Sequence, residues 1–446
     1  MLKIFDTLQN EIVKIDLPKD KPVNFYSCGP TVYGFAHIGN LRTFIMTDLL
    51  ARTLRANDYE VNWIMNLTDI DDKTINGTIS EFGNEATPTT LKSYTTKFSE
   101  KFIADLRAVG VNTEHIKFIN VTDTVAQIQE FILKLADKGY AYTADDGSTY
   151  FSIEKYQADF NDYGSLVGKK FLEGKKVGAR IKNDEYEKEN LSDFALWKSW
   201  DDSDAQVYWD HPILGKGRPG WHIECSVIND IAFKGEATDI HTGGVDLVFP
   251  HHTNEIAQSQ PVTNPFTHYW VHFEHLLVDG KKMSKSLGNI FTLDHLTNKG
   301  FSGLDLRYLF LQSGFRQQSN FTWEALESAK TARTKLKTAY QNEEQKEDTE
   351  DDDFLEALNE NLNSAEALAV AWDNKDNLKI YDQVLGLKLT EQETFEIPTE
   401  VQELLDNRAT AREEKDFDKS DKLRAEIETY GFDVKDTADG QILNKK

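Results

Sequence analysis

The sequence has little cysteine and no long apolar run. Its two cysteines, Cys28 and Cys225, lie far apart in a chain of 446 residues, so it lacks the dense disulfide framework of small secreted domains. No stretch of about 18 consecutive apolar residues occurs, which argues against a membrane span. The first ten residues include Asp6 and Asn10 instead of a basic region followed by an apolar run, so no secretory signal is visible. We therefore expect a cytoplasmic protein that does not associate with membranes, with two free thiols that are core residues or metal ligands.

Positive charge is also scarce. Lys and Arg number 50 against 75 Asp and Glu, which gives a net charge of −25. This balance argues against a general nucleic-acid binder, because phosphate contacts need local positive charge, but it is compatible with a locally basic face. No Walker loop and no HExxH motif occurs, so a P-loop nucleotide site and a zinc protease of that type are not predicted. The length predicts two to four domains.

The apolar pattern of the first part predicts an α/β fold. Val23–Ser27 and Val61–Leu67 are predicted strands, and the apolar positions of residues 38–54 recur at helical spacing. A strand, a helix and a strand in so short a segment form a βαβ unit, and hence a parallel sheet. Such sheets bind ligands at the carboxyl ends of their strands. Residues 28–40 and 68–73, which are rich in polar side chains, follow those ends.

Later segments change in character. A helix over Val125–Asp137 is predicted in what reads as an inserted module, and residues 269–278 belong to a second set of strand-like segments. Long helical patterns follow. The acidic run at residues 343–353 predicts a solvated linker or a frayed helix end. The terminal unit combines two polar helices with a strand-like ending at residues 432–443.

Two segments carry groups suited to phosphate. His37 and Gly39 stand where a helix begins, and exposed amides at a helix N-terminus favour phosphate; taken alone, such a histidine is more often a cap or a packing residue. Lys282 and Lys285, three positions apart in the segment KKMSKS, can meet one polyphosphate. A basic surface loop is the alternative.

A third segment offers metal ligands. On a helix, either His251 or His252 can face the same point as Glu255. Together with Cys28 and Cys225 they make a mixed sulfur, nitrogen and oxygen set of the kind that zinc accepts. The spacing does not choose between the two histidines, and it is also compatible with a salt-bridged surface helix.

The segment 215–220 matches the dinucleotide pattern G-x-G-x-x-G. That pattern should close a strand and open a helix. Here Pro212 precedes it and Pro219 falls inside it. A nicotinamide site is therefore not predicted.

In their order along the chain, these segments resemble class I aminoacyl-tRNA synthetases, and specifically the cysteinyl-tRNA synthetase family. The class signature HIGH appears as HIGN at residues 37–40, and KMSKS stands intact at residues 282–286. The blocks that carry the family resemblance are FYSCGPTVYGFAHIGN (residues 25–40), NLTDIDDK (66–73), GRPGWHIECS (217–226), DIHTGGVDLVFPHHTNEIAQS (239–259) and REEKDFDKSDKLRAEIETYGF (412–432).

The resemblance implies a domain order and a set of site residues. The domains are a Rossmann-like parallel-sheet catalytic domain (1–115 and 201–300), an inserted connective module (116–200), a helical bundle (301–387) and an anticodon-binding unit (388–446). The implied zinc ligands are Cys28, Cys225, His251 and Glu255. The implied catalytic residues are His37, Asn40, Lys282 and Lys285, and the implied ATP-binding residues are His37, Gly39, Asn40 and Lys285. The implied substrate-binding residues are Thr68, Trp221 and His241.

The function implied by the resemblance is ATP-dependent activation of cysteine and its transfer to the 3′ end of tRNA(Cys), with Mg²⁺ accompanying ATP and one Zn²⁺ per chain recognising the substrate thiolate. A monomer is expected. One rival is a ligase of the same fold that joins cysteine to an amino sugar; such relatives are expected to lack the terminal unit. Another is a paralogue that binds RNA or zinc without chemistry. Asn40 in place of the second signature histidine, and Thr253 where many relatives have an acid, are departures from the family pattern.

The basis for tRNA contact is weaker. Five basic residues recur at helical spacing and predict one basic face: Arg408, Arg412, Lys415, Lys419 and Lys422. Residues 388–446 nevertheless contain 10 basic and 16 acidic residues, a net charge of −6. The segment around Asp416 is also expected to divide this stretch into two helices. A salt-bridged surface is an equal alternative.

Overall fold

The computed structural model describes residues 1–168, 176–181, 190–263, 265–346, 353–391, 398–437 and 440–445. The chain divides into two compact units, Met1–Leu389 and Thr390–Lys446, which are described separately. The predicted domain limits stay predictions. The middle of the acidic run, residues 347–352, lies outside the described residues. Within the described ranges, no helix combines the length and the apolar character needed to cross a bilayer.

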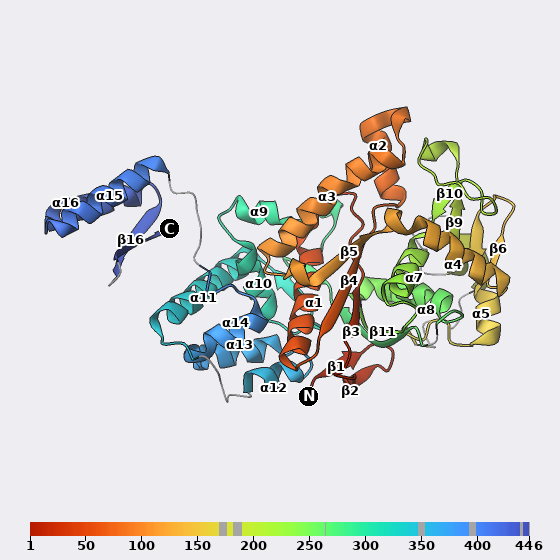
Figure 1. Cartoon of the computed structure of the whole chain (residues 1–446), viewed down its shortest axis with the longest axis horizontal. Helices are drawn as coiled ribbons and strands as arrows, with labels where there is room; N and C mark the ends of the chain where they lie inside the picture. The colour runs from red at the N-terminus through yellow and green to blue at the C-terminus, as the bar shows by residue number, and fades with distance from the viewer. Residues whose placement is uncertain are drawn as a thin grey trace. The chain divides into compact units, whose positions relative to one another are not determined.

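Five parallel strands form the centre of the larger unit (Figure 1). Their order is β12 (Thr267–Phe273), β11 (Thr238–Gly244), β3 (Val23–Ser27), β4 (Val61–Leu67) and β5 (Ile116–Asn120). Every neighbouring pair is parallel. Every residue of β3 is buried, as expected for a strand that is covered on both faces. The predicted Rossmann-like sheet is confirmed.

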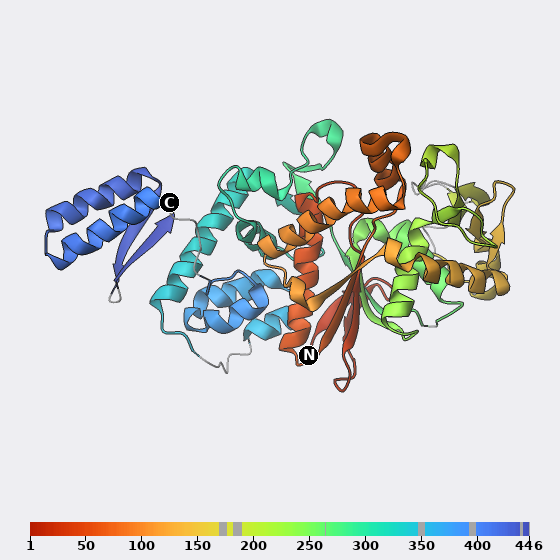
Figure 2. The same cartoon turned by 45° about the horizontal axis from the view of Figure 1, so that its top comes forward.

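The strand order reverses between β3 and β11. From β3 the chain continues to β4 and β5 on one side, and from β11 it continues to β12 on the other. Helix α1 (Ile38–Ala56) covers one face of the sheet and α7 (Trp221–Ala232) the other (Figures 1 and 2). At the carboxyl ends of the central strands, the backbone N–H of Cys28 donates to the carbonyl of Thr242 at 3.2 Å. Parallel α/β sheets bind their ligands at such a reversal.

A second sheet is inserted between β5 and β11. Its order is β10 (Gly217–Pro219), β9 (Asn190–Ser199), β7 (Thr149–Phe151) and β6 (Ala141–Thr143), with β8 (Lys176–Ile181) paired to β9. Helices α4 (Val125–Asp137) and α5 (Ile153–Asp159) pack with it. The helix predicted over Val125–Asp137 is confirmed.

The glycines of the segment 215–220 allow close backbone packing in this inserted sheet. A Cβ on Gly217 would lie 2.2 Å from the carbonyl oxygen of Lys198, and one on Gly220 would lie 1.9 Å from that of Ala195. Gly220 then leads into α7 as its N-cap. Chain packing thus explains these two glycines without a bound nucleotide.

The strand-like segment 269–278 is divided between two sheets. Its first part belongs to β12, and its last part is β13 (Leu276–Val278), which pairs with β14 (Lys281–Lys282) and β15 (Ser319–Phe321). The chain then returns to the start of α1, where Ile38 N–H donates to the carbonyl of Phe291 at 2.8 Å. This return brings the KMSKS segment near the HIGN segment.

The other elements of the larger unit are mainly helices. A hairpin of β1 (Lys3–Asp6) and β2 (Glu11–Lys14) begins the chain. The helices are α2 (Asp72–Phe82), α3 (Pro88–Ala108), α8 (Thr253–Ser259), α9 (Leu293–Thr297), α10 (Gly303–Leu311), α11 (Trp323–Asn342), α12 (Asp353–Asn359), α13 (Ser364–Asp373) and α14 (Leu378–Leu385). An ion pair of 2.7 Å between Arg307 of α10 and Asp48 of α1, both fully buried, joins the helical part to the sheet.

The smaller unit contains α15 (Thr399–Glu413), α16 (Phe417–Thr429) and an antiparallel pair, β16 (Phe432–Thr437) and β17 (Gly440–Lys445). Asp416 caps α16 and so separates the two helices, as expected. The single basic face predicted here is wrong in one respect. Arg408 has no exposed side chain and pairs with Asp436 at 2.9 Å, because a strand distant in sequence supplies a carboxylate for it.

Candidate active site and metal cluster

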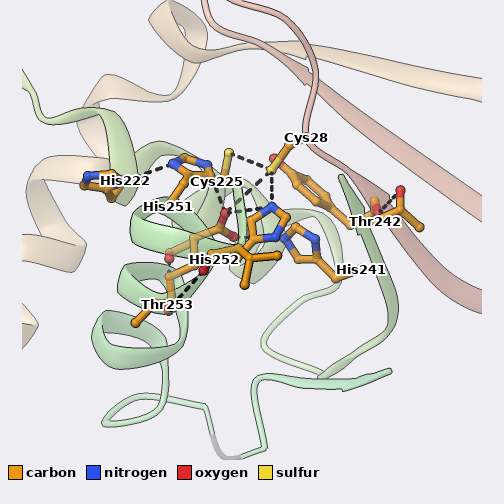
Figure 3. A network of polar contacts seen from close by, with 12 residues as sticks. Cys28, His222, Cys225, His241, Thr242, His251, His252 and Thr253 are labelled. Carbon is orange, nitrogen blue, oxygen red and sulfur yellow. Dashed lines mark hydrogen bonds and ion pairs between the residues drawn. The ribbon is translucent and has the colours of Figure 1, made fainter. Parts of the chain in front are cut away.

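Four predicted ligands meet at the carboxyl edge of the sheet (Figure 3). Cys28 directly follows β3, Cys225 lies in α7, His251 in the turn before α8, and Glu255 in α8. All four are buried, and their ligand atoms all lie within 4.8 Å of one another. The reversal in strand order places these elements together, so residues far apart in the sequence converge on one point.

The separations match what a tetrahedral zinc site requires. With Zn–S bonds of about 2.3 Å and Zn–O bonds of about 2.1 Å, two sulfurs lie about 3.8 Å apart and a sulfur and an oxygen about 3.6 Å apart. The two Sγ atoms are 3.7 Å apart, and Cys28 Sγ is 3.6 Å from Glu255 Oε1. His251 Nε2 is 3.0 Å from the same oxygen. A disulfide needs about 2.05 Å, so the thiols are free and the residues fit a metal.

A second set of ligand atoms overlaps the first. It consists of Cys28, His241, His252 and Glu255. His252 Nε2 lies 3.3 Å from Cys28 Sγ and 3.9 Å from Glu255 Oε1. This set contains one thiol, whereas the set with His251 contains both, and thiolates are the softer zinc ligands. The donor chemistry favours His251, and its role as a ligand stays a prediction.

Charge in the cluster is unevenly shared. Burial would raise the pKa of Glu255, but His241 and His251 outweigh it and hold this pKa at about 2. Burial would lower the pKa of His251, but Cys225 and Glu255 raise it to about 10. Burial would also raise the pKa of Cys225, but contacts with Cys28 and His251 lower it to about 6, whereas burial and its neighbours raise the pKa of Cys28. The thiols therefore differ in protonation, and a divalent cation would make both of them thiolates.

Histidines support the ligands from behind. His241 Nε2 lies 2.9 Å from Glu255 Oε2, and its ring stacks on Trp270 with centroids 4.4 Å apart. His222 Nδ1 lies 3.0 Å from His251 Nδ1. Partners of this kind fix the orientation of metal ligands. His241, predicted to bind substrate, thus lies against a metal-ligand candidate.

A cavity of about 170 Å³ opens in front of the cluster. The predicted site residues that line it are Cys28, Cys225, His251, Thr68, Trp221 and Asn40. Trp221 stacks on His251 with ring centroids 4.3 Å apart. Thr68 donates its hydroxyl to Glu224 at 3.3 Å. The other predicted site residues, His37, Gly39, His241, Glu255 and Lys282, are not part of this lining.

His37 caps helix α1. Its Nδ1 accepts from the backbone N–H of Asn40 at 3.1 Å, and Asn40 Oδ1 accepts from the backbone N–H of His37 at 3.2 Å. Burial lowers the pKa of His37, so the imidazole is neutral, and the cap assigns its proton to Nε2. The capping alternative is thus correct for Nδ1, while Nε2–H is the donor available for phosphate. Asn40 similarly keeps its Nδ2 amide for a ligand.

Gly39 joins this helix start to the KMSKS segment. A Cβ at Gly39 would lie 2.3 Å from Met283 Cε, so only glycine leaves room for the methionine. Lys282 ends β14 and is exposed. The side chain of Lys285 lies outside the described residues. The predicted contact of both lysines with one polyphosphate stays a prediction.

Asn66 was not predicted. It is buried inside the apolar strand β4, where its Oδ1 accepts from Gly29 N–H at 2.8 Å and from the Tyr26 hydroxyl at 3.1 Å. Its amide donates to Thr68 Oγ1 at 3.0 Å. It therefore fixes both segments that line the cavity. An amide within a strand that is otherwise apolar was the available signal.

Comparisons with known proteins agree with this geometry. Residues 14–331 match the model of the tRNA synthetases class I (C) catalytic domain, and residues 394–442 match that of the cysteinyl-tRNA ligase anticodon binding domain. The chain belongs to the cysteinyl-tRNA ligase family. The cysteine–tRNA ligase of Chlamydia caviae is 41% identical over 95% of this chain and 94% of the relative. That of Protochlamydia amoebophila is 39% identical over 100% of this chain and 98% of the relative.

Solved structures share the fold at low identity. The Mycobacterium tuberculosis methionyl-tRNA synthetase bound by methionyl-adenylate has a TM-score of 0.56 at 16% identity, covering 82% of this chain and 84% of its own. The Agrobacterium radiobacter LeuRS–tRNA–LeuAMS ternary complex has a TM-score of 0.55 at 12% identity, covering 83% of each chain. These likenesses place the family member within the class I fold.

Proposed function

We propose that this chain activates cysteine with ATP and transfers it to the 3′ end of tRNA(Cys). The observation that carries this proposal is the convergence of two thiols, an imidazole and a carboxylate on one point at the wall of a small cavity. The chain's membership of the cysteinyl-tRNA ligase family supports it.

We assign the cluster of Cys28, Cys225, His251 and Glu255 to one zinc ion. Serine differs from cysteine by one atom, and an apolar pocket separates such analogues by only about 1–3 kcal/mol. A zinc ion held there would take the substrate thiolate as a soft ligand that the serine hydroxyl does not match. Thr68 and Trp221 bound the cavity beside it, and His241 holds Glu255 in place.

Activation begins when the carboxylate of cysteine attacks the α-phosphorus of ATP. A carboxyl–phosphate bond forms, the bond between the α-phosphorus and the bridging oxygen breaks, and pyrophosphate leaves. The His37 Nε2–H and the Asn40 amide face this step from the start of α1, and Lys282 and Lys285 come from the KMSKS segment. Donors and cations so placed stabilise charge on the departing phosphates. Mg²⁺ accompanies ATP.

We assign tRNA recognition in part to the smaller unit. Phe417, the first residue of α16, is 58% exposed, and the side chain of Arg412, in the last turn of α15, is 40% exposed. Unpaired bases stack on exposed aromatic rings and guanidinium groups. The match of residues 394–442 to an anticodon-binding domain favours tRNA over the amino-sugar acceptor. The monomeric state and the cytoplasmic location stay predictions.

Cysteine-dependent exchange of pyrophosphate into ATP tests the first half of this proposal. We expect exchange with the zinc-loaded chain, its loss with a zinc chelator, and its return when zinc is restored. Charging of tRNA(Cys) tests the second half. Exchange without charging would favour the amino-sugar ligase, and the absence of exchange from a zinc-loaded chain would favour a paralogue without chemistry.

A further inference from the structure

A second cavity, of about 480 Å³, adjoins the amino-acid cavity. Thr31 and Trp221 line both, so the two spaces share a wall. One side of the second cavity is the start of α2. The other side comes from the inserted sheet, with Lys198 of β9, Arg218 of β10 and the turn Asp202–Asp204. A molecule seated between the sheet and the inserted module therefore lies next to the amino acid.

The cations of this cavity are already paired. The cationic residues that line it are Lys73, Lys198 and Arg218, and the anionic ones are Asp71, Asp72, Asp201 and Asp204. Lys198, with a side chain 3% exposed, binds Asp72 at 3.2 Å. Arg218 binds the same carboxylate and lies 3.7 Å from Asp204. A phosphate group inside would meet four carboxylates against three cations, so the walls favour a polar ligand without charge.

The mouth of the cavity has a different character. Lys73 is exposed there, and its Nζ lies 5.6 Å from the centroid of the Tyr33 ring. Tyr33 is itself 38% exposed. An aromatic ring beside a cation stacks a base and attracts a backbone phosphate. The volume lies within the range of about 300–1,000 Å³ that is usual for small-molecule sites, which suits one nucleoside.

We propose that the second cavity receives the terminal nucleoside of the tRNA, with the preceding nucleotide at Tyr33 and Lys73. This inference rests on the proposed function, which needs a third substrate beside the amino acid and the nucleotide. The terminal nucleoside carries free ribose hydroxyls and no 3′ phosphate, as the walls require. Across the wall formed by Thr31 and Trp221, a ribose hydroxyl oxygen attacks the carbonyl carbon of the adenylate. The carbonyl–phosphate bond breaks, AMP leaves, and the hydroxyl proton passes to solvent.

A pair of substitutions on α2 tests the assignment. Asn76 lines the second cavity, and Ser80, one turn further along the same helix, does not; both are exposed. In the zinc-loaded full chain, we expect Asn76→Trp to fill the cavity and slow single-turnover transfer to tRNA(Cys) by about 10²-fold, because small misplacement of a reactant is costly. Cysteine-dependent pyrophosphate exchange should stay within about twofold of wild type. Ser80→Trp should change neither rate.

The trinucleotide CCA serves as an independent probe. It should inhibit transfer by the wild-type chain without inhibiting exchange, and it should inhibit Asn76→Trp less. Equal loss of exchange and transfer in Asn76→Trp would assign the cavity to adenylate formation and overturn the inference, as would unchanged transfer. Wild-type exchange without any charging would instead overturn the tRNA half of the proposed function.

Discussion

Two clusters of charged side chains are buried in the larger unit, and they are built differently. In the first, Asp48 lies 2.7 Å from Arg307 and 2.7 Å from Arg52. The guanidinium groups also donate to backbone carbonyls, Arg307 to Leu385 at 2.5 Å and Arg52 to Gly110 at 2.9 Å. Charges and hydrogen bonds are satisfied by the chain itself, and the cluster ties α1 to α10 and α14.

In the second cluster, lone pairs face one another. The partners of Glu255 are His241, His251 and the Cys28 thiol, and a second thiol, Cys225, lies 3.7 Å from the first. A buried carboxylate paired to arginine is a structural device. Four converging donors without such a cation are a ligand set waiting for a metal. The comparison therefore separates a cluster that holds the fold from one that serves the reaction.

The largest effect should come from a ligand of the second cluster. We expect Cys225→Ser to lose bound zinc and to reduce kcat/KM for cysteine in pyrophosphate exchange by about 10⁴-fold, because the group that recognises the substrate sulfur is removed. Metal content by atomic emission and exchange rates measure this. Ser226→Ala, the next position on the same helix, should keep both. A Cys225→Ser chain that binds no zinc and still prefers cysteine to serine would refute the metal's role.

The opposite pattern is expected in the first cluster. Asp48→Asn should reduce the free energy of unfolding of the larger unit by about 3–5 kcal/mol, because it leaves Arg307 buried without its partner charge. Zinc content and exchange at a permissive temperature should stay near wild type. Urea unfolding followed by tryptophan fluorescence measures the difference. A variant with wild-type stability and lost exchange would break the distinction between the two clusters.

Acid should remove the advantage of wild-type Asp48. Burial would raise the pKa of Asp48, but Arg307 and Arg52 hold it below its usual value. The carboxylate thus contributes stability above the unfolded pKa of about 3.9. This contribution is lost as the pH falls through the lower folded pKa. The stability difference between wild type and Asp48→Asn should be constant near neutral pH and shrink below about pH 4.

Local patterns made much of this fold predictable. The strands β3 and β4 and the helix α4 have the predicted bounds, because each carries its own apolar pattern and its own end signals. Those strands also placed Cys28 and Thr68 at a ligand-binding edge. The convergence of Cys28 with residues of α7 and α8 came from the family resemblance, since spacing gives no contacts between distant segments.

What failed depended on partners distant in sequence. The helical spacing put Arg408 on a basic face, but Asp436, 28 residues further along, holds it in the interior. His241 was expected in the substrate pocket, and β11 instead places it behind Glu255. The spacing of His251 and His252 was equally ambiguous, because both reach Glu255 from one helical turn.

A smaller effect is expected one layer behind the metal. His241→Gln should weaken zinc affinity by about 10–100-fold, because it alters the group that orients Glu255. Competition with a chromogenic chelator measures this affinity. At saturating zinc, exchange should recover most of its wild-type rate, as a positioning residue requires. Failure to recover at saturating zinc would mean that His241 contacts the substrate directly.

The smallest effect concerns a buried carboxylate that has no arginine. Asp69 accepts from the backbone N–H of Thr122 at 2.9 Å and from its hydroxyl at 2.5 Å, and burial raises its pKa to about 6. A raised folded pKa means that ionisation costs stability as the pH rises from about 4 through 6, which is the reverse of Asp48. A shift of about two units corresponds to about 3 kcal/mol.

Asp69→Asn keeps the hydrogen-bond acceptor and removes the charge. Its amide must also be buried, which offsets part of the gain, so we expect stabilisation of about 1 kcal/mol at pH 7.5 and none below about pH 4. Urea unfolding across this pH range measures the effect. Asp48→Asn destabilises most at neutral pH, where Asp69→Asn stabilises most. If both substitutions destabilised the chain to the same extent and with the same pH profile, buried carboxylates here would not differ by their partners, and the distinction between the two clusters would lose its physical basis.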